Sequence, residues 1–404
     1  MSDNGSAATN GSQPARRSDT AGGIEAPTKE SEHRDLGHGT GAEMFQGIQG
    51  GRPVEERAGG PGERRRRRKG GGGRGGGEPT VVPDAEFRSY YGRPVLKSPV
   101  WERRIATYLF AGGLAAGTAV LGAGADLTGR EQLRRVSWLG SLGGLLLSVW
   151  ALVSDLGRPE RFHHMLRVAK PTSPMSVGTW ILTVFGPLAG LAAVRELFPM
   201  APARWRRTRA GRLLGRVLPW VARPAGVGAA VTAPGLAGYT AVLLSQTSVP
   251  AWSEVRDELP FVFTGSAAAS GGGFGMLAAP VAENGPARVF AAVGATQELV
   301  AGRVMERRMG LIRDAYHHGT VRKLGLAAEW LTVAGLVGTL TVAGRSRGGA
   351  AASGLALLAG SACQRLRVFE AGVESTKDPK YVVVPQRERL EARAGEPTRT
   401  GGGA

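Results

Sequence analysis

The charged string that follows the second long apolar run holds the side chains best suited to chemistry. It contains Asp155, Arg158 and Arg161, and it leads through two prolines to Trp180. Asp155 is predicted to lie at a membrane boundary, where pairing with Arg158 would lower the cost of holding either charge. A charged loop with an ordinary helix cap is the plainer interpretation. The convergence of these residue types favours a site at this membrane edge.

A second set of chemical groups lies at the end of the fourth apolar run. Tyr239 is inside that run, and Trp252 and Glu254 follow it on the side where the Asp155 loop is expected. A phenol, an indole and a carboxylate beside an apolar pocket suit a quinone head group, because they supply hydrogen bonds and a proton route. Composition alone favours a simpler assignment, the aromatic belt of a membrane protein.

Carboxylates also occur in the later apolar runs. Glu298 lies within the sixth run and Glu329 near the start of the seventh. An acidic side chain inside a membrane is a functional candidate, so Glu298 is a candidate for a proton path. A structural pair with a neighbouring arginine is an equal alternative, and Glu329 is expected at the interface.

Cysteine and histidine usage limits the cofactors that the chain could bind. The single cysteine, Cys363, excludes a disulfide framework, a thiolate zinc site and a self-held iron–sulfur cluster. The six histidines, at 33, 38, 163, 164, 317 and 318, all fall in the tail or in connections. A membrane haem needs histidines that face each other inside the bundle. We therefore expect no haem, no iron–sulfur cluster and no metal site in this chain.

Eight apolar stretches of about 20 residues must position these groups, since this length crosses about 30 Å of hydrocarbon. They cover residues 105–125, 136–154, 176–197, 225–247, 261–282, 286–302, 324–343 and 350–370. Glycine pairs four residues apart occur in several of them, at 113 and 117, 140 and 144, and 271 and 275. Such pairs either let helices approach closely or are ordinary glycine-rich sequence. The prediction is an all-α integral membrane protein of about eight transmembrane helices in two four-helix bundles.

The rest of the chain is polar. It has 404 residues with 51 Lys and Arg against 33 Asp and Glu, a formal net charge of +18. Residues 1–86 are poor in large apolar side chains and are predicted to be disordered. Their basic run at 64–69 has no interleaved aromatic residues, so we expect a solvated anchor or a lipid contact and no nucleic acid. Residues 87–375 form the predicted membrane domain, and 376–404 a polar C-terminal tail.

The distribution of basic residues bears on orientation. No signal peptide is visible, and an even number of spans puts both termini on one side. Basic residues in the connections on that side favour a cytoplasmic location of both termini in the plasma membrane. The arginine-rich stretch 204–216 lies on the other side and argues the other way.

Several of these motifs together resemble the NrfD/PsrC family, the membrane subunits of polysulfide-reductase-type complexes. The strings that carry the resemblance are residues 155–162 with 170–180, residues 90–95 leading to Trp101 and 108–117, and residues 239–245 with 249–252. The resemblance covers about residues 87–375 and is most specific in the first two-thirds.

The resemblance implies an eight-helix quinone-binding subunit without haem. It implies partners: a ferredoxin-like iron–sulfur subunit joined to a molybdopterin oxidoreductase, with a formate-dehydrogenase-like reaction as one candidate upstream. It also implies a menaquinone-type quinone near the first four helices, with Asp155 and Tyr239 as catalytic residues. The predicted pocket residues are Tyr108, Arg158, Arg161, Trp180 and Trp252. Some family members carry a histidine in the first helix near the quinone, and Tyr108 is the residue that could replace it here.

Two other functions remain open from the sequence. A proton-coupled transporter would also have eight spans, glycine-rich helices and an isolated intramembrane acid such as Glu298. No internal repeat relates the first four runs to the last four, which counts against it. A passive anchor would dock the oxidoreductase and bind no quinone.

Overall fold

The computed structural model describes residues 95–395, and over that range the chain is helical with no strand. All of these residues lie in one of the two units of the chain, Glu55–Ala404. The predicted tail at 1–86 lies outside the described residues. So do residues 90–94 of the string 90–95 that contributes to the family resemblance.

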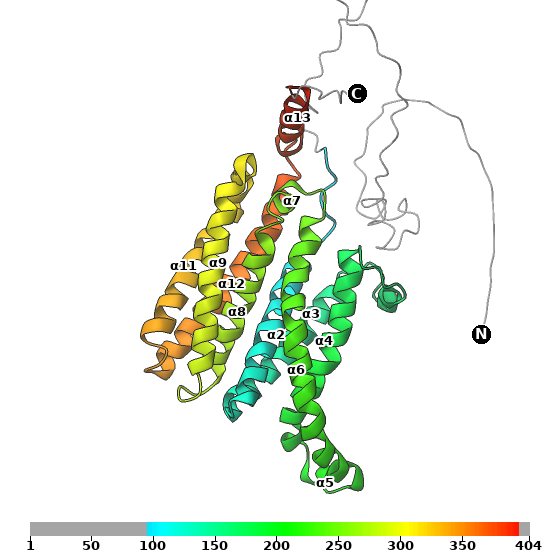
Figure 1. The fold of residues 1–404 in the computed structure, drawn as a ribbon, viewed down its shortest axis with the longest axis vertical. Helices are drawn as coiled ribbons and strands as arrows, with labels where there is room; N and C mark the ends of the chain where they lie inside the picture. The colour runs from blue at the N-terminus through cyan, green and yellow to red at the C-terminus, as the bar shows by residue number, and fades with distance from the viewer. Residues whose placement is uncertain (1–94, 396–404) are drawn as a thin grey trace, which may run out of the picture. The chain divides into compact units, whose positions relative to one another are not determined.

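Within this range eight helices have 20 or more residues (Figure 1). They are α2 Arg103–Leu127, α3 Glu131–Ser154, α4 Pro174–Leu197, α6 Arg209–Ser245, α8 Leu259–Ala278, α9 Gly285–Arg308, α11 Gly319–Thr341 and α12 Arg347–Ser375. The shorter elements are η1 Pro159–Leu166, η2 Phe198–Met200, α5 Ala203–Arg206, α7 Pro250–Ser253, η3 Gly310–Ile312, α10 Arg313–His317 and α13 Lys380–Gly395. Each predicted apolar stretch thus corresponds to one long helix.

Five of the long helices are long and apolar enough to cross a membrane. These are α2, α3, α4 extended to Met200, α6 and α11. The stretches predicted at 261–282, 286–302 and 350–370 form α8, α9 and α12, which fall outside this set. Their sequences explain this, because α8 is rich in glycine, alanine and serine, while α9 and α12 carry charged side chains. The described region is therefore all-helical, with five candidate membrane spans.

Helix α6 differs most from its prediction. It begins at Arg209 rather than near 225 and has 37 residues. The Thr208 side chain caps its start by accepting a hydrogen bond from the Gly211 N–H at 3.1 Å. The arginine-rich stretch 204–216, predicted as a connection, therefore contains part of α5 and the first turns of α6. At 1.5 Å per residue, α6 is about 55 Å long, well beyond the roughly 30 Å of a hydrocarbon core.

Backbone contact at glycines sets how the helices pack. Helix α2 packs against α3, α6 and α8, helix α4 against α6, helix α8 against α9 and α12, and α11 against α12 (Figure 1). At the α2–α8 contact, a Cβ on Gly117 would lie 2.1 Å from the backbone oxygen of Ala267. All six glycines of the predicted pairs meet a neighbouring helix at 3.0 Å or less by the same measure. Gly117, Gly144 and Gly271 meet the backbone of the neighbouring helix, as in close helix approach in membranes, whereas the other three make room for the side chains of Arg365, Phe274 and Leu121.

The segment predicted as a polar C-terminal tail contains helix α13. Its first turn is attached to the helical region, because Tyr381 is buried and the Lys380 ammonium lies 3.7 Å from Asp314 in α10. This segment is more ordered at its start than its composition suggests.

Candidate functional site

One end of the long helices gathers residues that are far apart in the sequence. Asp155 directly follows α3 and accepts a hydrogen bond from the backbone N–H of Glu102, just before α2. Trp252 in α7 stacks on Trp101, with ring centroids 5.7 Å apart. The Asp155 loop and the turn after α6 thus lie at the same end, next to the start of α2.

Asp155 has a different partner from the one predicted. It makes no ion pair with Arg158, and instead lies beside Glu102 and Arg104. Burial raises the pKa of Asp155 above its ordinary value, and this effect exceeds the lowering by the Glu102 N–H and the Arg104 charge. The half-buried carboxyl group therefore keeps a proton more readily than an exposed aspartate does.

Three of the predicted pocket residues face outward. Arg158 and Arg161, at the beginning of the η1 segment, are exposed and form no ion pair with any described residue. Trp180 is 39% exposed, and its indole N–H donates to the Val168 carbonyl at 3.2 Å. These three side chains therefore lie at the surface of the described region.

Tyr108 in α2 and Tyr239 in α6 lie in one buried hydrophobic cluster. The Tyr239 ring occupies the space above Gly178 in α4, where an added Cβ would lie 2.1 Å from Cε2. Neither tyrosine hydroxyl has a hydrogen-bond partner among the described residues. Neither hydroxyl oxygen is completely enclosed by the surrounding atoms. Each hydroxyl group therefore reaches accessible space in apolar surroundings and is free to donate to a ligand oxygen.

Trp252 does not fit the predicted role of a pocket wall. It is fully buried, and its N–H donates to the Val368 carbonyl in α12 at 2.7 Å. It packs on Phe369, and a Cβ on Gly372 would overlap its ring. Trp252 is thus a packing residue that joins α7 to α12.

Glu298 has an unusual environment in the later helices. It is 5% exposed, accepts a hydrogen bond from Ser266, and its Oε2 atom has no partner. Arg365 in α12 is 1% exposed and donates to the Phe263 carbonyl at 2.6 Å, with its guanidinium 3.8 Å from the Phe263 ring centroid. Two of its nitrogen atoms lack partners, and it forms no direct ion pair with Glu298. A buried carboxyl group and a buried guanidinium group thus each keep atoms without a hydrogen-bond partner.

Sequence reasoning missed Arg365. The available signal was a basic residue inside the apolar stretch 350–370, where a charge is costly and therefore notable. Arg367 lies two residues further on, and its guanidinium pairs with Glu306 at 2.7 Å.

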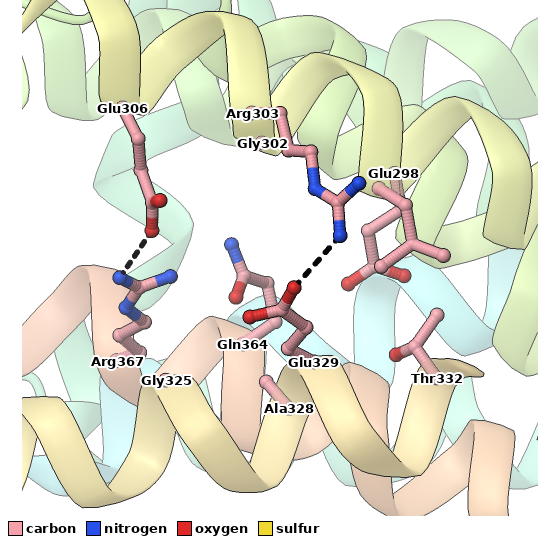
Figure 2. Close-up of a pocket in the computed structure, with 11 residues that line it drawn as sticks. Glu298, Gly302, Arg303, Glu306, Gly325, Ala328, Glu329, Thr332, Gln364 and Arg367 are labelled. Carbon is pink, nitrogen blue, oxygen red and sulfur yellow. Dashed lines mark hydrogen bonds and ion pairs between the residues drawn. The ribbon is translucent and has the colours of Figure 1, made fainter. Parts of the chain in front are cut away.

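A small cavity adjoins Glu298 between α9, α11 and α12 (Figure 2). Its volume of about 40 Å³ exceeds the 10–15 Å³ that one water molecule needs. The Arg303–Glu329 pair, at 3.0 Å and largely exposed, lies on its wall together with the Arg367–Glu306 pair. Polar side chains therefore connect the exposed surface to the buried carboxyl group.

At the opposite end of α2, α3, α4 and α6, a network of ion pairs joins the helices. Asp126 at the end of α2 pairs with Arg134, Arg195 and Arg223 at 3.2–3.5 Å. Glu196 pairs with Arg134 at 2.7 Å. Both acids are largely shielded from solvent, with side chains 11% and 6% exposed. The network joins α2, α3, α4 and α6.

The histidines and the cysteine are dispersed in the described part of the chain. His163 and His164 are neighbours in η1, whereas His317 and His318 lie at the end of α10. Cys363 is a free thiol in α12. Over residues 95–395, no group of three or more His, Cys, Asp or Glu side chains is placed to hold a metal ion.

A comparison with protein families finds one match. The family described as polysulphide reductase, NrfD, matches residues 95–289. The predicted resemblance is thereby confirmed over α2, α3, α4, α6 and α8. Most of α9 and all of α11 and α12, which carry Glu298 and Arg365, lie beyond the matched residues. A comparison with curated proteins finds no significant match.

Proposed function

Because residues 95–289 match the NrfD family, we propose that this chain is the membrane subunit of a multi-subunit oxidoreductase. It would exchange electrons between an iron–sulfur partner and the membrane quinone pool. Members of the family generally interact with quinone and typically assemble with iron–sulfur and molybdopterin subunits. The observation that carries the proposal is that Tyr108 and Tyr239, both in the matched region, have unpartnered hydroxyl groups and belong to one buried apolar cluster.

The proposal includes the topology. All eight long helices would cross the membrane, as a bundle of α2, α3, α4 and α6 beside one of α8, α9, α11 and α12. The packing partners support this grouping, and the polar side chains of α8, α9 and α12 include several that are buried between helices. Both termini would lie on the cytoplasmic side of the plasma membrane.

The tyrosine cluster has the donor set that a quinone requires. A quinone presents two carbonyl oxygens that accept hydrogen bonds and a ring that prefers apolar neighbours. Tyr108 and Tyr239 supply two hydroxyl donors, and the surrounding cluster is aliphatic and aromatic. We propose a menaquinone-type quinone as the ligand. When bound, the quinone supplies the capacity to take or give two electrons and two protons.

Each candidate site residue then has a defined role in the proposal. Tyr239, held in place by its packing on Gly178, donates a hydrogen bond to one quinone oxygen, and Tyr108 binds from α2. Asp155 holds a proton at the membrane boundary and exchanges it with water. Arg158 and Arg161 lie on the exposed surface beside it, where a partner subunit would dock. Trp252 keeps the end of α12 in place.

Glu298 is proposed as part of a proton path. Its unpartnered Oε2 and the adjoining cavity suit a group that exchanges protons with entering water. Arg365, buried in the neighbouring helix α12, has two nitrogen atoms without a partner that could also bind entering water. The same features would serve a proton-coupled transporter, so transport assays belong in the test.

The decisive experiment combines purification with a matched pair of tyrosine variants. The tagged chain is isolated in mild detergent, and iron, molybdenum and quinone are quantified in what copurifies. Tyr239→Phe keeps the ring on Gly178 and removes only the donor, so we expect an intact complex with quinone reduction lowered at least tenfold. Tyr316→Phe is the control, because that hydroxyl is buried but already donates to the Ala251 carbonyl.

Two outcomes would contradict the proposal. Unchanged quinone reduction in both Tyr239→Phe and Tyr108→Phe would leave only a passive anchor. A chain that purifies alone, without quinone or metal, and that moves solute in vesicles would be a transporter.

A further inference from the structure

A hollow lined with arginine lies at the N-terminal end of α6. Its walls are Ala203 and Arg206 from α5, Arg207 just after α5, and Arg212 from the first turn of α6. Residues 203–216 contain six arginines and no acidic residue. Figure 1 shows α5 at the far end of α6, away from α7.

These arginines have no acidic partner in the described part of the chain. Asp126 and Glu196 pair with other arginines, Arg134, Arg195 and Arg223, and with none of the three that line the hollow. Among the four residues that line the hollow, the one described side-chain hydrogen bond joins Arg206 Nε to the Ala201 carbonyl at 3.0 Å. Several guanidinium groups thus converge with their charge unneutralised, a state that a bound anion would relieve.

The surface next to the hollow is apolar. Leu213 is 63% exposed, Val217 45% and Trp220 82%, all on α6. Trp205 is 42% exposed and packs edge-on against Phe198. Since α6 is much longer than the hydrocarbon core, its first turns reach the head-group level, where Trp and Arg side chains are typically found.

We propose that this hollow binds the phosphate group of an anionic phospholipid. The guanidinium groups of Arg206, Arg207 and Arg212 would contact the phosphate oxygens, with the fork geometry that suits this group. The acyl chains would lie along Leu213, Val217 and Trp220. This continuous apolar surface distinguishes a lipid from free phosphate, which would gain nothing from it.

The test measures lipid binding to the purified full chain. Retention of phosphatidylglycerol and of phosphatidylcholine is quantified by native mass spectrometry, together with the shift in unfolding temperature that each lipid causes. We expect the wild type to prefer phosphatidylglycerol at least tenfold. Arg207→Gln combined with Arg212→Gln should abolish this preference and leave phosphatidylcholine retention unchanged. Both side chains are exposed, so folding should be preserved.

A charge-matched control separates a site from general attraction. Arg204→Gln combined with Arg209→Gln removes the same charge from the same segment but leaves the hollow intact, and we expect less than a threefold effect. Equal losses in the two double variants would overturn the proposal, as would equal retention of both lipids. Displacement of phosphatidylglycerol by inorganic phosphate at millimolar concentration would show a free-anion site instead. None of these outcomes depends on quinone chemistry.

Discussion

At the scale of single residues, the position of the Tyr239 ring depends on the glycine at residue 178, which has no side chain. Gly178→Ala would place a methyl group 2.1 Å from the Tyr239 ring, so the ring must move. Overpacking of this kind costs about 1–3 kcal/mol. We expect an assembled complex with quinone reduction at least tenfold lower. Gly190→Ala in the same helix, with open space around it, should behave as wild type. Equal activity in both variants would remove Tyr239 from the site.

A second prediction at this scale concerns pH. The pKa of Asp155 is raised on folding, so the folded state binds the proton more tightly than the unfolded state. The free energy of unfolding should therefore fall as pH rises from the ordinary aspartate range through the raised pKa. Asp155→Asn should remove this fall, whereas Asp257→Asn, on an exposed side chain, should keep it. Chemical unfolding in detergent at several pH values would measure it, and identical slopes would refute the assignment.

The candidate residues that sequence reasoning located are those marked by local context. Asp155 and Tyr239 stand out because a charged loop and a polar ring interrupt apolar sequence. The enclosure of Trp252 was not predictable, since it depends on Val368 and Gly372 more than a hundred residues away. The Asp155–Glu102 contact likewise joins separate segments, and spacing alone had suggested Arg158 as the partner.

At the scale of helices, the charge network at the far end of α2 should be a main source of stability. Arg134→Gln leaves Glu196 without its one ion-pair partner, while Asp126 keeps two arginines. Breaking a buried pair costs of order 3 kcal/mol. Reversible unfolding in mild detergent should show this loss. Arg256→Gln, which breaks an exposed pair with Asp257, should cost under about 1 kcal/mol. Equal effects would mean that the network contributes no more than a surface pair.

Hydropathy predicted the existence of the long helices better than their ends. Mean hydropathy detects the part of a helix that lies in hydrocarbon. It therefore located 225–247 but not the first turns of α6, where arginines alternate with apolar residues. It also could not separate a helix facing lipid from one enclosed by others. The glycines of α8 illustrate this, because they lower hydropathy while they let backbones touch.

At the scale of the whole molecule, the number of crossings can be counted by cysteine labelling. In a Cys363→Ser background, Lys97→Cys and Arg387→Cys should react from the same side of the membrane. Thr128→Cys and Ala282→Cys should react from the opposite side. If only the five most apolar helices cross, Arg387→Cys would react from the side opposite to Lys97→Cys. All four positions are exposed; Lys97, Thr128 and Ala282 lie outside the helices and Arg387 lies within α13, so labelling reports sidedness rather than burial.

Helix α2 takes part in both candidate sites. Tyr108 belongs to the proposed quinone site, and five residues later, about 7.5 Å along the helix, a Cβ on Gly113 would lie 3.0 Å from Arg365. The absence of a side chain there means that the guanidinium rests almost against the backbone of α2. If binding at one site displaces α2, this contact would transmit the displacement to the other site. Thermodynamic reciprocity then requires that protonation near Arg365 change ligand affinity at Tyr108 by the same factor as the ligand changes the proton affinity.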